Sequence, residues 1–345
     1  MAVNNLSLDD KDFGEILPLI KDDQITDINF NGESLWVDHL TKGRYEVTDI
    51  IVTESWLTQF MQKISNKMNV QCNKSQPFIE AETDELRVSI LHPAITNTGF
   101  SLSIRKTPPV RRLKYNKMIE EEYCPKEVEA FLANCVRCQM NLVVTGLPGT
   151  GKTELVKYLT KYIPPYEKVI TIEDNLEIRY SDINPEKDCV EVKVSDKLEY
   201  DTAIKLCMRQ LPTWILLAET RGKEVVELLK ALSTGTHCLT TLHTDTTRKV
   251  PERMKNMSID VNVNDVYMFI DVAVQIKSKV IPGKGIKRWL SEVSLIYHNV
   301  ENGENKIIMI YEDGEYNKND IPKEVMRKFK EYDIEDPFVN NETLE

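Results

Sequence analysis

The chain has 345 residues, enough for about two domains, and its 41% hydrophobic and 29% charged residues are typical of a folded protein. Acidic residues outnumber basic ones by 55 to 44, and the net charge of −11 disfavours general binding to phosphate backbones and anionic lipid surfaces. Length and composition together exclude a peptide-sized fold, a disulfide-stapled scaffold and a disordered chain.

Residues 1–107 are predicted to form a small α/β domain. Apolar side chains recur at helical spacing between Glu54 and Met68, which predicts a helix over that segment. Short strands are expected at 25–29, 34–38, 44–47, 50–53, 86–91 and 100–104. Pro108 and Pro109 then prevent the continuation of a helix and favour an extended tether, so we expect a linker over residues 108–124.

Residues 125–345 are predicted to form a second domain in which strands and helices alternate. Strands are expected at 141–145, 168–172, 214–218 and 239–242, and helices at 125–138, 152–162, 203–211 and 223–232. This alternation predicts a mostly parallel sheet covered by helices. Further strands at 269–276, 289–297 and 306–311, joined through turns at Pro282-Gly283 and Asn302-Gly303, are expected to close the sheet edge as antiparallel strands. A short helix at 323–332 and an acidic tail follow.

The cysteines and the N-terminus indicate a reducing compartment. Seven cysteines are scattered along the chain, and only Cys135 and Cys138 form a CxxC pair, without a second pair or a nearby histidine to complete a zinc site. We expect both to be buried thiols. No segment has the roughly 18 apolar residues of a membrane-spanning helix, and no basic region begins the chain. We therefore expect a cytosolic protein.

A phosphate-binding signature stands between a predicted strand and a predicted helix. The sequence GLPGTGKT at residues 146–153 is a complete GxxxxGK[ST] motif, in which glycines let backbone N–H groups surround a phosphate. Lys152 is expected to reach the β- and γ-phosphates, and Thr153 to bind Mg²⁺. The predicted nucleotide contacts are Gly146, Pro148, Gly149, Thr150, Gly151, Lys152, Thr153 and Glu154.

Two acidic residues follow apolar strands beyond this loop. Hydrolysis of a nucleoside triphosphate needs an acid that holds Mg²⁺ or orients the attacking water beside the loop. Glu219 ends the run Trp214-Ile-Leu-Leu-Ala218, and Glu173 ends the run Ile170-Thr-Ile172. We predict that Glu219 is catalytic and shares Mg²⁺ with Thr153, and that Glu173 is a second catalytic acid.

Four segments in order resemble the Walker A, Asp, Walker B and His boxes of the type II/type IV secretion ATPases, which include VirB-type, CpaF, PilT and GspE relatives. These segments are 146–153, 172–177, 209–221 and 234–243. Residues 26–37 and 86–106 are similar to strands and arginines of the same family's N-terminal domain. The resemblance covers roughly residues 15 to 300.

The resemblance implies a RecA-like P-loop NTPase domain at the C-terminus and a smaller, PAS-like α/β domain at the N-terminus. It also implies a homo-hexameric ring in which ATP, bound with Mg²⁺ between the domains, drives domain motion. Glu219 would be the Walker B acid, Glu173 an Asp-box acid, and His243 a link between nucleotide and ring. Arg87 and Arg105 would approach the γ-phosphate, where guanidinium groups stabilise the charge of phosphoryl transfer.

Several positions depart from the family pattern. They are Glu154 after the Walker A threonine, Thr213 and Ala218 in the Walker B segment, Gly222 after Arg221, and Thr236 with a displaced His237 in the His box. Lys152, Thr153, Glu219 and His243 are all retained. The departures indicate a divergent branch of the family and leave the role of His237 open.

Three other functions compete with this interpretation. A GTPase would use Asn317 in its NKxD sequence, but Asn317 follows a polar turn and not a core strand. An AAA+ ATPase would carry an Asp before Glu219, where this chain has Ala218. A scaffold that binds nucleotide without hydrolysing it remains open because the boxes are altered.

The expected partners follow from the resemblance. We expect contact with membrane-embedded secretion or pilus components at the inner face of the cell membrane, through partner proteins, because the chain has neither a span nor a basic amphipathic anchor. Direct binding to nucleic acid is not expected. Chain length and the compact N-terminal domain favour conjugation or type IV secretion, with protein export, DNA transfer and pilus assembly all left open.

Overall fold

Residues 6–281 and 285–340 are described by a computed structural model, in which contacts between residues divide the chain into two units. The first unit consists of residues 1–108 and 279–287, and the second of 109–278 and 288–345. Residues 279–281 and 285–287, which we expected in the second domain, therefore belong to the first unit. The expected turn at Pro282-Gly283 lies outside the described residues.

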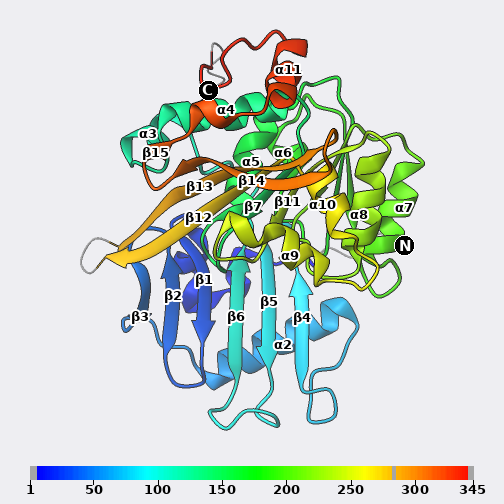
Figure 1. Ribbon diagram of the computed structural model, residues 1–345. Helices are drawn as coiled ribbons and strands as arrows, with labels where there is room; N and C mark the ends of the chain where they lie inside the picture. The colour runs from blue at the N-terminus through cyan, green and yellow to red at the C-terminus, as the bar shows by residue number, and fades with distance from the viewer. Residues whose placement is uncertain (1–5, 282–284, 341–345) are drawn as a thin grey trace. The chain divides into compact units, whose positions relative to one another are not determined.

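The first unit contains one antiparallel sheet with the strand order β3-β2-β1-β6-β5-β4 (Figure 1). Its strands are β1 (Ile25–Phe30), β2 (Leu35–His39), β3 (Gly43–Val47), β4 (Phe78–Glu82), β5 (Leu86–Leu91) and β6 (Ser101–Lys106). Its helices are η1 (Asp10–Asp12), η2 (Gly14–Ile16), α1 (Leu17–Lys21) and α2 (Glu54–Met68). The strand expected at 50–53 does not form, and β4 was not predicted.

Helix α2 has the predicted bounds because its start and its buried face are both encoded locally. The Thr53 hydroxyl accepts the N–H of Trp56 as an N-cap, and Asn69 ends the helix in the left-handed conformation. Leu57 and Ile64 are buried on the face that packs over the sheet. Thr53 therefore caps a helix where we expected the end of a strand.

The second unit contains a nine-stranded sheet with the order β15-β14-β13-β12-β7-β11-β10-β8-β9. The strands are β7 (Leu142–Thr145), β8 (Val169–Glu173), β9 (Cys189–Lys193), β10 (Trp214–Leu217), β11 (His237–Leu242), β12 (Val272–Ile281), β13 (Gly285–Asn299), β14 (Glu304–Glu312) and β15 (Glu315–Tyr316). The longer helices are α4 (Lys126–Arg137), α5 (Lys152–Leu159), α7 (Tyr200–Met208), α8 (Glu224–Ser233) and α11 (Lys323–Glu331). Shorter ones are α3 (Tyr115–Glu120), η3 (Thr160–Tyr162), α6 (Tyr180–Ile183), η4 (Thr247–Lys249), α9 (Val250–Lys255), α10 (Val263–Phe269) and η5 (Lys318–Asp320).

The six strands from β12 to β9 in this order are parallel to their neighbours. Strand β12, which we expected to be antiparallel, instead pairs in parallel with the P-loop strand β7, with Val272 opposite Leu142. Antiparallel pairing is found farther out, between β13 and β14 and between β14 and β15. The predicted parallel core is confirmed, and it is one strand wider than we expected at this edge.

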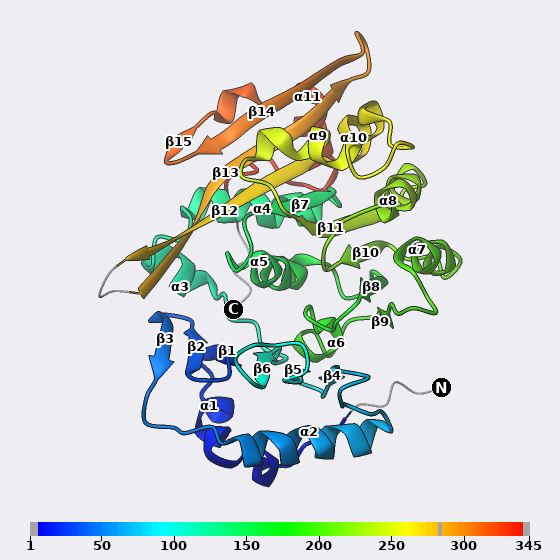
Figure 2. The ribbon, with the colours of Figure 1, turned by 90° about the horizontal axis from the view of Figure 1, so that it is seen from below.

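Helices cover both faces of the parallel core. Side chains of β7 alternate between the two faces: Leu142 and Val144 join the cluster with α4 and α5, whereas Val143 joins the cluster with α7 and α8. Figure 2 shows α5 on one side of these strands and α7 and α8 on the other. Because both faces are covered, strands β7 and β10 are fully buried, and their sequences are almost entirely apolar.

Two smaller predictions have different outcomes. Cys135 and Cys138 are fully buried free thiols, as expected. The segment expected as a linker contains α3, and its Met118 and Tyr123 are buried in the core of the second unit. Among the residues that the structure describes, no helix is both long and apolar enough to cross a bilayer.

Candidate nucleotide-binding site

The phosphate-binding loop joins β7 to α5, and its backbone requires glycine. Gly146, Gly149 and Gly151 have φ angles of 152°, 76° and 95°, in the region that side chains with a Cβ rarely adopt. A Cβ on Gly146 would lie 2.6 Å from the Thr150 hydroxyl oxygen and 2.8 Å from the Ile276 carbonyl oxygen. The glycines of the motif are therefore needed for the shape of the loop itself.

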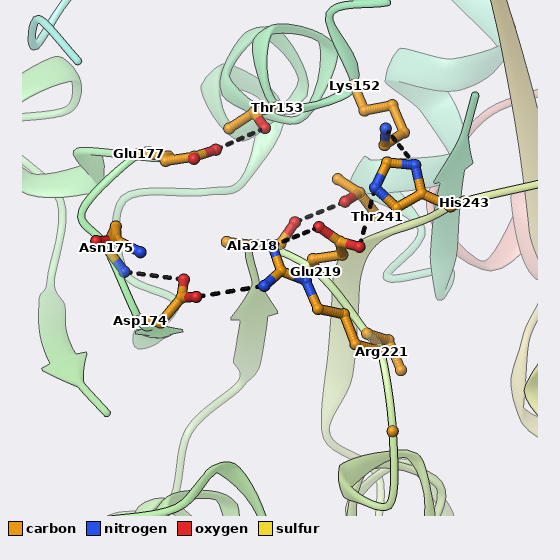
Figure 3. Close-up of polar contacts among 12 residues, drawn as sticks. Lys152, Thr153, Asp174, Asn175, Glu177, Ala218, Glu219, Arg221, Thr241 and His243 are labelled. Carbon is orange, nitrogen blue, oxygen red and sulfur yellow. Dashed lines mark hydrogen bonds and ion pairs between the residues drawn. The ribbon is translucent and has the colours of Figure 1, made fainter. Parts of the chain in front are cut away.

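Parallel pairing brings the predicted site residues of this unit to one edge of the sheet. The loop follows β7, Glu219 follows β10, and His243 follows β11. The carboxyl ends of parallel strands meet at the same edge, which is where α/β sheets bind their ligands. Figure 3 shows Lys152, His243 and Glu219 pointing toward one another from these three elements.

Lys152 is buried and directs its ammonium group at three acceptors. The nitrogen lies 3.1 Å from the Gly146 carbonyl oxygen, 3.3 Å from the Leu147 carbonyl oxygen and 3.1 Å from Nδ1 of His243. An ammonium group has three protons, so these contacts use all of them. Burial lowers the pKa of Lys152 to about 8, although the carboxylates of Glu219 and Glu177 favour its charged form.

His243 connects this lysine to Glu219. Nε2 of His243 lies 3.0 Å from Oε1 of Glu219. Nδ1 of His243 lies 3.1 Å from the Lys152 nitrogen, which donates, and 3.1 Å from the Gly146 carbonyl oxygen, which accepts, while Nε2 faces the carboxylate. The imidazole therefore joins the P-loop to the end of β10.

Glu219 is held from its other side by Arg221. A guanidinium nitrogen of Arg221 lies 2.8 Å from Oε2 of Glu219, and a second one lies 3.4 Å from Asp174. The hydrogen bond with Glu219 raises the pKa of Arg221. Both oxygens of the Glu219 carboxylate thus have a donor, so its orientation is fixed (Figure 3).

Hydrogen bonds of threonines connect the ends of β10 and β11, next to Glu219 and His243. The Thr241 hydroxyl donates to the Ala218 carbonyl at 2.7 Å, and the N–H of Thr220 donates to the Thr241 carbonyl at 2.9 Å. The hydroxyls of Thr220 and Thr240 are also 2.8 Å apart. These buried contacts fix the position of Glu219 relative to His243.

Glu173 has a different environment from Glu219. It is completely buried, and its Oε1 accepts the N–H groups of Glu177 and Ile178 at 3.2 and 3.0 Å. Burial raises the pKa of Glu173 to about 8, which favours the neutral acid near neutral pH. We expected this carboxyl beside the water or Mg²⁺, whereas the structure places it inside, where it supports the loop after β8.

Glu177, at the end of that loop, is the acid that reaches the P-loop helix. Its Oε2 accepts the Thr153 hydroxyl at 3.2 Å. Sequence analysis gave no role to Glu177, Arg221 or Asp174, although all three stand in the Asp and Walker B boxes. Their spacing from Glu173 and Glu219 marked them as neighbours in the chain, but only the packing of β8 beside β10 shows which of them face the loop.

A family model described as "Type II/IV secretion system protein" matches residues 59–281. The chain belongs to this family. An uncharacterized protein of Bacillus anthracis is 28% identical over 318 residues, which cover 88% of this chain and 72% of that protein. Type IV secretion system protein VirB11 of Brucella suis is 28% identical over 246 residues, covering 60% of this chain and 67% of that protein.

The fold agrees with this assignment. The crystal structure of the pilus retraction motor PilT with bound ADP matches with a TM-score of 0.60 at 18% identity, covering 83% of each chain. At this identity the likeness concerns the fold alone. It confirms the predicted α/β class, with a RecA-like domain after a smaller α/β domain.

Two residues at which the chain departs from the family pattern, Glu154 and His237, lie outside the contacts between Lys152, His243 and Glu219. Oε2 of Glu154 accepts the N–H of Arg112 at 3.2 Å, so this side chain contacts the segment before α3. His237 begins β11, at the opposite end of that strand from His243, and packs on Trp214. Burial lowers the pKa of His237 to about 4. His237 therefore lies at the other edge of the sheet from the P-loop.

Arg87 and Arg105 belong to the first unit, where they stand opposite each other on β5 and β6. Arg105 forms an ion pair with Asp27 at 2.8 Å, and Arg87 lies 3.9 Å from Glu82. Both side chains stand on the sheet face that does not contribute to the buried core under α2. Their expected approach to a γ-phosphate stays a prediction.

The buried Glu173 predicts a pH-dependent stability. Its pKa rises from 4.5 to about 8 on folding, so the folded state binds the extra proton and stability falls as pH rises through this window. Glu173→Gln stays neutral, so its stability relative to wild type should increase by up to about 1.4 kcal/mol per pH unit between pH 5.5 and 8. Thermal melts of both proteins measure this, with the exposed Glu186→Gln as control. A difference that does not change with pH would contradict the assignment.

Proposed function

We propose that this chain is an ATPase that powers a type IV secretion or conjugation machine. The observation that carries the proposal is the convergence of Lys152, His243 and Glu219 at the carboxyl edge of the sheet, beside a complete P-loop. Membership of the secretion family supports it, as does the name of the Brucella relative, a type IV secretion system protein. The pilus motor of similar fold binds ADP, which supports an adenine nucleotide as the ligand.

The loop and α5 fit a polyphosphate. The glycine conformations would let N–H groups of the loop and of the first turn of α5 face phosphate oxygens, and the helix dipole favours negative charge there. Lys152 would exchange the two carbonyl oxygens of its own loop for phosphate oxygens, which are stronger acceptors. Thr153 would release Glu177 and bind Mg²⁺, which when present neutralises the phosphate charge.

Glu219 fits the role of the acid that orients the attacking water. Arg221 and His243 contact its two oxygens, so the carboxylate is held in one orientation, as a base that positions water requires. His243 contacts both Lys152 and Glu219. A movement of the lysine would therefore shift the imidazole and, through it, the carboxylate of Glu219. Glu173 would act as a support for the Asp-box loop, and Glu177 as the acid that faces the loop.

We further propose that six copies form a ring at the inner face of the cell membrane, where they contact membrane-embedded secretion components. In such a ring Arg87 and Arg105 would supply positive charge to the γ-phosphate, as the family resemblance implies. The GTPase alternative gains no support, because the Asn317 side chain donates to the Met309 carbonyl on β14 and does not stand near the P-loop strand.

The first prediction concerns binding. Lys152→Ala removes the cation of the loop and should weaken ATP binding by about 100-fold, since each charged hydrogen bond contributes about 1.5–3 kcal/mol. Calorimetry with ATP and Mg²⁺ measures the affinity. Lys168→Ala serves as control because Lys168 contacts the Gln210 carbonyl before β10. Equal affinity of wild type and Lys152→Ala would contradict the whole assignment.

A second prediction separates an enzyme from a nucleotide-binding scaffold. Glu219→Gln keeps the shape of the side chain but loses the base, so phosphate release should fall by about 100-fold or more while ATP affinity stays within threefold. The exposed Glu252→Gln on α9 should keep the wild-type rate. Equal, negligible rates in wild type and Glu219→Gln would favour the scaffold instead.

The ring is tested by sedimentation velocity. Wild type with a non-hydrolysable ATP analogue and Mg²⁺ should sediment as a hexamer, because a ligand that binds the assembled form more tightly shifts the equilibrium toward it. Lys152→Ala under the same conditions should show less of the large species. A monomer at every protein and nucleotide concentration would rule out the ring.

A further inference from the structure

An arginine from β13 lies against the last glycine of the phosphate-binding loop. A Cβ built on Gly151 would lie 3.8 Å from Cδ of Arg288, so the stem of this side chain is packed at the point where α5 begins. The strand is held there by the N–H of Leu290, which donates to the Tyr123 carbonyl at 2.7 Å. The guanidinium group follows Cδ directly, so a cation lies close to the last glycine of the loop.

Arg288 belongs to a group of charges at the start of α5. Glu154, the third residue of that helix, accepts the N–H of Arg112 and also lies 3.5 Å from the Lys157 ammonium. Burial lowers the pKa of Arg288, and the charge of Arg112 lowers it further, whereas Tyr123 and Glu154 act in the opposite direction. Two guanidinium groups and one carboxylate are thus within electrostatic range of each other beside Gly151.

The carboxylate of Glu154 is unfavourable for phosphate binding, and the neighbouring guanidinium groups can compensate for its charge. A carboxylate directly after the Walker A threonine repels the phosphates that the loop is shaped to bind. A guanidinium group compensates for such a charge, and its planar donors can also bind a phosphate in bidentate fashion. The departure of Glu154 from the family pattern and the position of Arg288 therefore have a common explanation.

We propose that Arg288 contacts the phosphate chain of a bound nucleoside di- or triphosphate, as a second cation beside Lys152. The inference rests on the proposed function, because it requires that the loop binds nucleotide. It goes beyond that function by assigning a ligand-binding residue on β13, outside the four boxes of the family.

The experiment is a double-mutant cycle with ADP and Mg²⁺, read by calorimetry at two salt concentrations. Arg288→Gln should weaken ADP binding about tenfold and reduce its salt dependence, and a smaller loss of affinity should remain in the Glu154→Thr background, where no carboxylate needs compensation. Arg288→Lys, which keeps charge and stem, should lose less affinity and provides the test if the Gln variant does not fold. The control is Arg248→Gln, which removes an exposed arginine paired with Glu312.

Each result decides the matter. Wild-type affinity in Arg288→Gln overturns the proposal while the proposed function stands, since wild type binds ADP. A loss that disappears in the Glu154→Thr background overturns it as well, because Arg288 then only neutralises Glu154. No ADP binding by wild type overturns both the proposed function and the role of Arg288.

Discussion

The ammonium group of Lys152 holds the candidate site together. It contacts two carbonyl oxygens of its own loop and the imidazole of His243, and His243 in turn contacts Glu219. The loop after β7, the turn after β10 and the end of β11 are therefore joined through one buried cation. If a polyphosphate binds this loop, as we propose, it would compete for that cation with the carbonyl oxygens, which would couple binding to the position of Glu219 by direct contact.

The departures from the family pattern leave this arrangement intact. Ala218 contributes its backbone carbonyl as the acceptor for Thr241, a contact that does not depend on the side chain. The N–H groups of Arg221 and Gly222 both donate to the Glu224 carboxylate, which fixes the turn after Glu219. His237 lies at the far end of β11, where it packs on Trp214. The altered positions therefore change the surroundings of the site and not its central contacts.

The sequence predicted the elements whose signals are local. The apolar spacing between Glu54 and Met68 predicted α2, and the glycine pattern predicted the loop before Lys152. Strands β4 and β9 were missed because they are short and lie at sheet edges, so their identity depends on a single neighbouring strand. The parallel pairing of β12 also depends on a partner far away in the sequence.

The same distinction holds for the site. Motif spacing identified Lys152 and Glu219, but it did not reveal that Glu173 is buried or that Glu177 contacts Thr153. Burial and side-chain direction are set by the strands on either side of β8, and a single sequence does not record them. Arg288 was missed for a similar reason, because no motif in β13 indicates that this strand lies beside the loop between β7 and α5.

The most direct test of the account is a crystal structure of the protein with a non-hydrolysable ATP analogue and Mg²⁺. We expect the Lys152 nitrogen to leave the Gly146 and Leu147 carbonyl oxygens for the β- and γ-phosphate oxygens, with the Glu219 carboxylate directed at the γ-phosphate. A structure in which the analogue binds elsewhere, or in which Lys152 keeps its carbonyl contacts with nucleotide present, would contradict it.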